Sequence, residues 1–242
     1  MKVNNTLQFR QDSSVGKWFV RDASDQLVKR DHGKLEAQAR PLFFPKGGMF
    51  FLEGQPAAGI FLLCTGRAKE SIISSSGRTA IVRVVGPGVI LGLAAVLTGT
   101  PHESTVEMLE PSHADFLAKI PFLQLLKTSG RLGHIVTMQL IRDRKEAYAS
   151  IRCRSLSRTV SERFARLVLH WAECPLASQS KYTAKAQIRV TLTHEEIAQA
   201  MGTTRETTSR TLREFREKQW ITINGSIWTI SNEGAIRHLA AL

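Results

Sequence analysis

Short apolar runs separated by turn sequences dominate the chain between Pro41 and about Pro111. Two examples are IFLL at 60–63 and AIVRVV at 80–85, which have the length and composition of β-strands. Turn sequences such as PKGG at 45–48 and GPG at 86–88 recur at steps of roughly 8 to 12 residues, the spacing of a sandwich or barrel of short strands. The pattern therefore predicts a β domain and by itself indicates no activity.

The periodicity becomes helical after this segment, and turn residues are rare between about Phe116 and Glu173. After Gly130, positions spaced by three and four predict one long helix. A long helix beside a β domain commonly buries such a stripe against a second copy of the chain, so we expect a dimerisation helix. Packing against the chain's own β domain is the alternative. The stripe consists of Leu132, Ile135, Val136, Gln139, Leu140, Asp143, Ala147 and Ile151. A second helix follows from Val160 to Trp171 and is broken at Pro175.

Two helix-start signals stand close together near the C-terminus. Thr193 followed by Glu196 is a capping box that begins the first helix. Gly202 provides the left-handed residue that ends this helix in a sharp turn. Thr203 followed by Glu206 predicts a second capping box, so the next helix starts at once. Two short helices joined by a tight glycine turn form a helix-turn-helix.

The segment after the second helix predicts a β-hairpin. Residues 221–223 (ITI) and 227–230 (IWTI) flank the pair Asn224-Gly225, a strong hairpin signal. In the second helix, Leu212 and Phe215 face inward and leave the polar and basic residues on another face. The helices and the hairpin together predict a winged helix-turn-helix.

The charge of the chain fits a polyanionic partner. Its 242 residues include 33 Lys or Arg and 21 Asp or Glu, which gives a formal net charge of +12. Residues 151–242 hold 14 of the basic and 8 of the acidic residues, so the last part of the chain carries half of the excess. A basic surface that serves only solubility is the alternative.

The second helix of the pair carries side chains that can read base pairs. Arginine donates two hydrogen bonds to guanine, and glutamate accepts one from cytosine N4. Glu206 and Arg210 are four residues apart and share a helix face, although a plain surface ion pair is the alternative. Threonines near helix starts add hydroxyls where backbone N–H groups meet phosphates. The candidate DNA-binding residues are Thr193, Thr203, Thr204, Arg205, Glu206, Ser209, Arg210 and Arg213.

Several classes of protein are poor fits to the composition. No apolar run approaches the roughly 18 residues of a membrane-spanning helix, and residues 1–10 (MKVNNTLQFR) lack the apolar core of a secretory signal, so we expect a cytoplasmic protein without membrane partners. Cys64, Cys153 and Cys174 are too far apart for a disulfide framework or a zinc finger. We find no HExxH, GxSxG or phosphate-binding loop, so we expect no enzyme, no metal and no cofactor.

The order of these parts resembles the CRP/FNR family of bacterial transcription regulators from about Phe43 to the C-terminus. The resemblance rests on GIFLLCTGRAK (59–69), VVGPGVILGL (84–93), the long helix and TRETTSRTLREF (204–215). It implies an α+β fold with a jelly-roll-like N-terminal β-roll of the cyclic-nucleotide-binding type, a long dimerisation helix and a C-terminal winged helix-turn-helix. We divide the chain accordingly into an N-terminal arm (1–40), a β-roll sensor domain (41–130), the dimerisation helix (131–157) and the DNA-binding domain (158–242).

The resemblance also implies a homodimer on a palindromic operator in double-stranded DNA, with RNA polymerase as a further partner. The FNR-type motif E-x-x-S-R falls on Glu206, Ser209 and Arg210, and the CRP-type motif R-E-T falls on Arg205, Glu206 and Thr207. Because both types of motif read a shared GA step, we expect an inverted repeat of TTGA- or TGA-like half-sites about one helical turn apart.

The sensor positions that hold cyclic AMP in family members differ here. Leu93 stands where a glutamate binds the ribose, and Glu103 stands where an arginine binds the phosphate, so a carboxylate would repel the ligand. Tyr148 and Ala149 replace the residues of the long helix that reach the adenine. We therefore expect control by an unidentified small-molecule effector other than cyclic AMP. The candidate effector pocket comprises Gly92, Leu93, Glu103, Ser104, Thr105, Arg144 and Tyr148.

Other sensing chemistries and one other binding function are the alternatives. An iron–sulfur cluster is excluded because the family places its thiolates mostly near the N-terminus, and residues 1–63 contain no cysteine. Haem needs one or two axial ligands, for which His102, His113, His134 or Cys64 would be candidates. Cys153 is a candidate redox switch, although an inert thiol is the favoured interpretation. A winged helix that contacts protein is the alternative to DNA binding.

Overall fold

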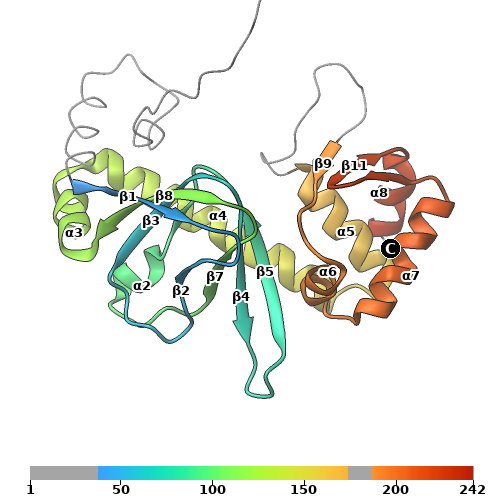
Figure 1. Cartoon of the computed structure of the whole chain (residues 1–242), viewed down its shortest axis with the longest axis horizontal. Coiled ribbons are helices and arrows are strands. Elements are labelled where there is room, and N and C mark those ends of the chain that lie inside the picture. Colours follow the sequence, from blue (N-terminus) through green and yellow to red (C-terminus); the bar gives the residue numbers. More distant parts are fainter. Residues whose placement is uncertain (1–37, 174–186, 242) are drawn as a thin grey trace, which may run out of the picture.

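The computed structural model describes residues 38–173 and 187–241, in which a β domain and a smaller C-terminal domain are connected by one long helix (Figure 1). The predicted α+β fold class is confirmed: the β-rich domain comes first, the long helix second and the winged helix-turn-helix last. Most of the predicted N-terminal arm, together with Cys174 and Pro175, lies outside the described residues.

Two antiparallel four-stranded sheets form the β domain. Their strand orders are β1–β8–β3–β6 and β2–β7–β4–β5. The strands are β1 (Arg40–Phe44), β2 (Met49–Phe51), β3 (Gly59–Thr65), β4 (Ala68–Ile73), β5 (Thr79–Val85), β6 (Ile90–Leu91), β7 (Thr105–Met108) and β8 (Ser112–Ala118).

Strand β3 sends alternate side chains into two different cores. Ile60, Leu62 and Cys64 pack against helices on the outside of its sheet, and Phe61 and Leu63 point into the space between the two sheets. Because successive residues of a strand face opposite sides, burial on both faces requires an uninterrupted apolar run. This requirement explains the sequence IFLLC at 60–64.

Three helices accompany the sheets: α2 (Leu93–Thr98), α3 (Lys119–Thr128) and α4 (Gly130–Ser155). The first half of α4 packs on the β domain, where Leu132 and Val136 contact the core that contains Ile60 and Phe122. The expectation that this stripe faces a partner copy is therefore wrong for its first half. The physical reason is that the outer face of sheet β1–β8–β3–β6 would otherwise expose its apolar side chains to water.

A different side of α4 is open to solvent. Met138 is 39% exposed, Tyr148 51% and Ile151 55%. Ile151 is the only one of these three that belongs to the helical stripe predicted from the sequence. The predicted stripe and the exposed apolar face are therefore largely different sides of α4. Among residues 38–173 and 187–241, no helix combines the length and the apolar character needed to cross a membrane.

The C-terminal domain packs helices on a small sheet with the order β10–β11–β9. Its core includes Phe164, Phe215 and Trp228; the rings of Phe164 and Phe215 meet edge to face with their centroids 4.8 Å apart. The elements are α5 (Val160–Glu173), β9 (Gln187–Arg189), α6 (His194–Met201), α7 (Arg205–Glu217), β10 (Ile221–Asn224), β11 (Ile227–Ile230) and α8 (Glu233–Ala241).

The hairpin of the wing turns one residue later than predicted. Asn224 pairs with Ile227, so the loop is Gly225-Ser226 and not Asn224-Gly225. Gly225 has a φ of +58° and stands at the first central position of the loop, where a type II′ turn requires a positive φ and therefore favours glycine. The predicted hairpin is confirmed; of its two predicted turn residues, Gly225 is in the loop, whereas Asn224 is the last residue of β10.

Candidate nucleic-acid interface

The predicted capping box at the start of α6 is present. The hydroxyl oxygen of Thr193 accepts a hydrogen bond from the Glu196 N–H at 3.2 Å, and the Glu196 carboxylate accepts one from the Thr193 N–H at 2.8 Å. At the other end, Gly202 adopts φ +68°, and its N–H donates to the Ala198 carbonyl. A residue with a Cβ is strained at this φ, so glycine permits the sharp turn between the two helices.

The second helix starts differently from the prediction. Its N-cap is Thr204, whose hydroxyl oxygen accepts from the Thr207 N–H at 3.2 Å. Thr203 lies in the turn, where its N–H donates to the Ala198 carbonyl at 3.0 Å. The predicted capping box between Thr203 and Glu206 is therefore wrong. Glu206 is instead the second residue of α7, and hydrogen bonds from its own N–H and from the Thr204 hydroxyl lower the pKa of its carboxyl.

Helix α7 has a buried face and an exposed face on opposite sides. The buried face packs into the domain, and the exposed face carries the predicted base-reading side chains. In Figure 1, α7 lies at the outer edge of the C-terminal domain, on the side away from the β domain. This exposed face is therefore accessible. The buried residues are Thr208, Thr211, Leu212 and Phe215, and the exposed ones are Arg205, Glu206, Arg210 and Arg213.

Ser209 lies between these two faces and already has a partner. Its hydroxyl is 2.9 Å from Nδ1 of His194, the first residue of α6. This contact joins the first residue of α6 to the fifth residue of α7. His194 was not predicted as a site residue, because no periodic pattern relates positions 15 residues apart across a turn.

Side chains of helix α5 hold the turn between α6 and α7 in place. The Arg163 guanidinium donates to the carbonyls of Met201 and Gly202 at 3.3 and 3.2 Å, and the Ser161 hydroxyl donates to Glu214 of α7 at 3.3 Å. These contacts hold the geometry of the two helices before any ligand arrives, which favours rigid recognition.

Basic side chains continue from α7 towards the wing. A shallow polar groove between the end of α7 and strand β10 is lined by residues that include Arg213, Arg216 and Lys218. The Lys218 ammonium pairs with Glu214 at 2.6 Å and lies 4.7 Å from the centroid of the Trp220 ring. Arginine and lysine in such a groove provide the charge that binds phosphates. The sequence analysis did not select Arg216 or Lys218.

The predicted effector positions lie in different surroundings. Leu93 is 2% exposed and belongs to the core under α4, whereas Glu103 is exposed. Gly92 caps α2 with φ +84°. Tyr148 is half exposed on α4, with the Arg144 guanidinium 5.9 Å from the centroid of its ring.

Two of these positions take part in hydrogen bonds within the β domain. The Thr105 hydroxyl accepts from the Glu53 N–H at 3.0 Å. The Ser104 hydroxyl donates to Glu70 at 2.5 Å, and the Arg83 guanidinium pairs with Glu70 at 2.5 Å and with Asp143 of α4. Ser104 thus belongs to a network of charged side chains that connects sheet β2–β7–β4–β5 with α4.

His102, a candidate haem ligand, and Cys153, the candidate redox switch, both make contacts within the protein. His102 is buried and stacks on Phe51 with ring centroids 3.7 Å apart, and burial lowers its pKa. The Cys153 thiol donates to the Arg163 carbonyl at 3.3 Å, and burial raises its pKa, which favours the unreactive thiol form. In the described part of the chain, no group of three or more His, Cys, Asp or Glu side chains is arranged to hold a metal ion.

Two family descriptions match the chain. Residues 41–129 match the cyclic nucleotide-binding domain, and residues 162–239 match the Crp-like helix-turn-helix domain. The matched segments correspond to the two domains of the structure and leave most of α4 between them.

Curated relatives cover most of the chain at low identity. A CRP-like cAMP-activated global transcriptional regulator of Mycobacterium tuberculosis is 24% identical over 200 residues, which are 82% of this chain and 87% of the relative. The fumarate and nitrate reduction regulatory protein of Vibrio cholerae is 24% identical over 223 residues, 91% of this chain and 82% of the relative. Among solved structures, FixK2 from Bradyrhizobium japonicum shares the fold with a TM-score of 0.73 at 19% identity, covering 84% of this chain and 98% of that one.

Proposed function

The chain belongs to the CRP/FNR family of DNA-binding transcription regulators, and we propose that it binds an inverted repeat in DNA as a homodimer. The observation that carries the proposal is the exposed face of α7, where Arg205, Glu206 and Arg210 lie together while the opposite face is buried. Helix α7 would enter the major groove, with Arg210 on a guanine of a TTGA- or TGA-like half-site. Thr193, Thr203, Thr204, Ser209 and Arg213 would complete the contacts, mainly to phosphates.

The exposed face of α4 supports a dimer. Met138, Ile141, Tyr148 and Ile151 are separated by three, seven and three residues, which places them on one side of the helix. Three of them are large, exposed and apolar, and a group of exposed apolar side chains on one side of a helix is typical of an interface. We therefore assign residues 131–157 to dimerisation, through this face of the helix, and residues 158–242 to DNA binding. RNA polymerase is the further partner that the family implies.

We also propose that the effector is not cyclic AMP. Glu103 would place a carboxylate where the cyclic phosphate binds, and the Leu93 side chain is taken up by the core. Titration of the full chain with cyclic AMP in a calorimeter tests this proposal. We expect no heat of binding, and saturable binding would contradict the proposal.

Selection of bound duplexes from a random DNA pool tests DNA recognition. We expect enrichment of a two-fold inverted repeat whose half-site centres are about 10 base pairs apart, with an affinity that falls steeply as salt rises. Recovery of no symmetric sequence, together with binding that salt does not change, would favour a winged helix that contacts protein.

A further inference from the structure

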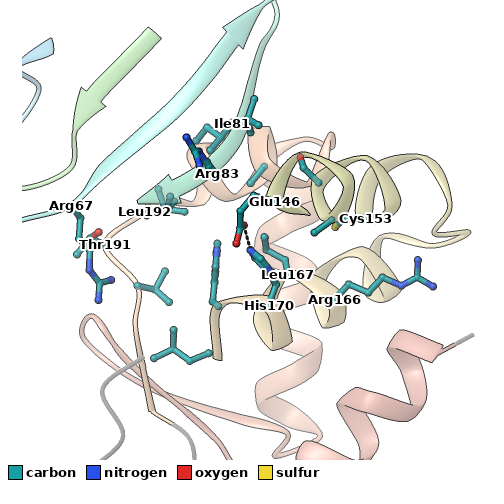
Figure 2. Close-up of a pocket in the computed structure, with 18 of the residues that line it drawn as sticks. Arg67, Ile81, Arg83, Glu146, Cys153, Arg166, Leu167, His170, Thr191 and Leu192 are labelled. Atoms are coloured by element: carbon teal, nitrogen blue, oxygen red, sulfur yellow. Dashed lines mark ion pairs between the residues drawn. The ribbon is translucent and has the colours of Figure 1, made fainter. Parts of the chain in front are cut away.

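A cavity of about 250 Å³ lies where the β domain, α4 and the C-terminal domain meet (Figure 2). We call it the junction cavity. Its walls come from β5, the second half of α4, α5 and the segment that leads from β9 into α6. None of the seven effector positions predicted from the sequence is among its lining residues, so it is a separate site.

Most of the cavity wall is apolar. Ile81 and Val84 come from β5, Leu167 and Trp171 from α5, and Leu192 from the segment before α6. An apolar cavity of about 150 Å³ stays dry and accepts benzene. The junction cavity is larger, so it would accept one substituted ring or two fused rings. Filling it would restore dispersion contacts that the empty space forfeits.

One end of the cavity carries a polar group without a partner. The hydroxyl oxygen of Thr191 is buried and has no hydrogen-bond partner among the described residues. A buried polar atom of this kind is rare, because leaving it unpaired is unfavourable. Figure 2 shows Arg67 beside Thr191; its guanidinium donates to the Arg189 carbonyl and brings a positive charge to this end. The combination favours a negatively charged oxygen on the ligand.

Two other groups of polar side chains in the wall are engaged within the protein. The Glu146 carboxylate is 2.7 Å from Nε2 of His170, so their charges offset each other, and the pair lies within the cavity lining in Figure 2. Arg83 uses its guanidinium on Glu70 and Asp143. Because the Glu146 carboxylate and the His170 ring already satisfy each other, an anionic ligand would place its charge at the Thr191 end and its ring among the apolar residues.

We propose that the junction cavity binds a small aromatic carboxylate, which accepts a hydrogen bond from the Thr191 hydroxyl and packs its ring between β5 and α5. The walls belong to the sensor side and to the DNA-binding side, so the ligand binds only while the two are joined as in this structure. Binding therefore stabilises this arrangement of the domains. The inference does not depend on what α7 binds.

Calorimetric titration of the full chain with 2-naphthoate tests the proposal. We expect saturable binding of one ligand per chain with a Kd of about 1 mM or tighter, as ligand size predicts. Thr191→Val keeps the shape and removes the hydroxyl, and we expect it to weaken binding by about tenfold. The matched control Thr222→Val changes an exposed threonine of the wing and leaves the Kd unchanged. The neutral analogue 2-naphthalenemethanol binds about tenfold more weakly than 2-naphthoate.

A cavity-filling variant locates the site independently. Ala149 lines the cavity from α4, and Ala149→Phe abolishes binding while a thermal melt checks that the variant is folded. If Ala149→Phe does not fold, the Kd values of Thr191→Val and Thr222→Val for 2-naphthoate decide whether the ligand occupies the junction cavity. Bound 2-naphthoate also slows hydrogen exchange at residues 190–192. The proposal is overturned by a titration without saturation, by equal Kd values for the wild type and Thr191→Val, or by exchange at 190–192 that the ligand leaves unchanged.

Discussion

The ammonium of Lys69, on strand β4 of the β domain, lies 2.6 Å from the carboxylate of Glu196 on helix α6. Glu196 is also the residue that completes the capping box at the start of that helix. Burial would raise the pKa of Glu196, but the hydrogen bonds from Lys69 and Thr193 lower it more, so the carboxyl stays ionised. Sheet β2–β7–β4–β5 of the β domain thus contacts the first helix of the helix-turn-helix through the side chain that caps that helix.

Removal of this cation should destabilise the contact between the domains. Both side chains are less than one fifth exposed, so Lys69→Met leaves the mostly buried Glu196 carboxylate without its cation and also removes the pair of Lys69 with Glu107 at 3.1 Å. We expect a loss of about 1–2 kcal/mol of unfolding free energy, less than for a fully buried pair. Lys218→Met is the control, because it breaks an exposed pair with Glu214 and should cost less than about 0.5 kcal/mol. Equal losses in urea unfolding would show that the Lys69 contact is only a surface pair.

Charges on the exposed face of α4 should separate the dimer. The double variant Tyr148→Glu with Ile151→Glu places carboxylates opposite each other in the proposed interface, where their repulsion and desolvation oppose association. Sedimentation should show a monomer for this variant and a dimer for the wild type. Ile120→Glu on α3, at a position that is 69% exposed, is the control and should stay dimeric. A dimeric double variant would show that the interface lies elsewhere.

The pair Glu146–His170 should make stability depend on pH. Its hydrogen bond raises the pKa of His170 and lowers that of Glu146. The folded-state pKa of His170 therefore exceeds the unfolded value of about 6.5, so the stabilisation is complete below that value and is lost as the pH rises through the raised pKa. On the acid side it is lost as the pH falls through the lowered pKa of Glu146.

Melting temperatures measured between pH 6 and pH 9 test this dependence. The difference between the wild type and His170→Gln should be largest near pH 6 and should shrink as the pH rises. A difference that stays constant across this range would mean that the pair contributes no charge-dependent stability.

A glycine should stabilise the end of α7. Gln219 follows helix α7 and has a φ of +56°. A residue with a side chain adopts this left-handed conformation only at a cost in free energy, whereas glycine does not. The Trp220 N–H donates to the Phe215 carbonyl, as in a Schellman motif. We expect Gln219→Gly to raise the free energy of unfolding by about 0.5–1 kcal/mol. The control Gln199→Gly, inside α6, should lower it by a similar amount, and a decrease for Gln219→Gly would refute the strain.

Local signals made most of the fold predictable. The capping box at Thr193 and the glycine at 202 act within one helical turn, so they are readable in the sequence, and the structure has both. The start of α7 was misplaced by one residue because Thr203 and Thr204 are both good N-caps, and only the fold decides which one has an extended backbone.

Contacts between distant residues could not be predicted in this way. Lys69 and Glu196 are 127 positions apart, and no periodicity relates a strand of one domain to a helix of another. The stripe on α4 was visible, but its partner was not, since a sheet of the same chain and a second chain offer similar apolar surfaces. The junction cavity left no pattern in the sequence either, because its walls come from four elements that are far apart in the chain.

The most direct test of DNA reading by α7 is a base-pair scan of the selected operator with the wild type and Arg210→Ala. Binding of duplexes with every single substitution is measured at fixed salt, with Arg78→Ala, an exposed arginine of the β4–β5 hairpin, as the control. We predict that Arg210→Ala costs about 1–3 kcal/mol and removes discrimination at two positions placed symmetrically about the operator's centre. Uniform weakening at all positions, or loss at one position only, would contradict recognition by two α7 helices in a two-fold arrangement.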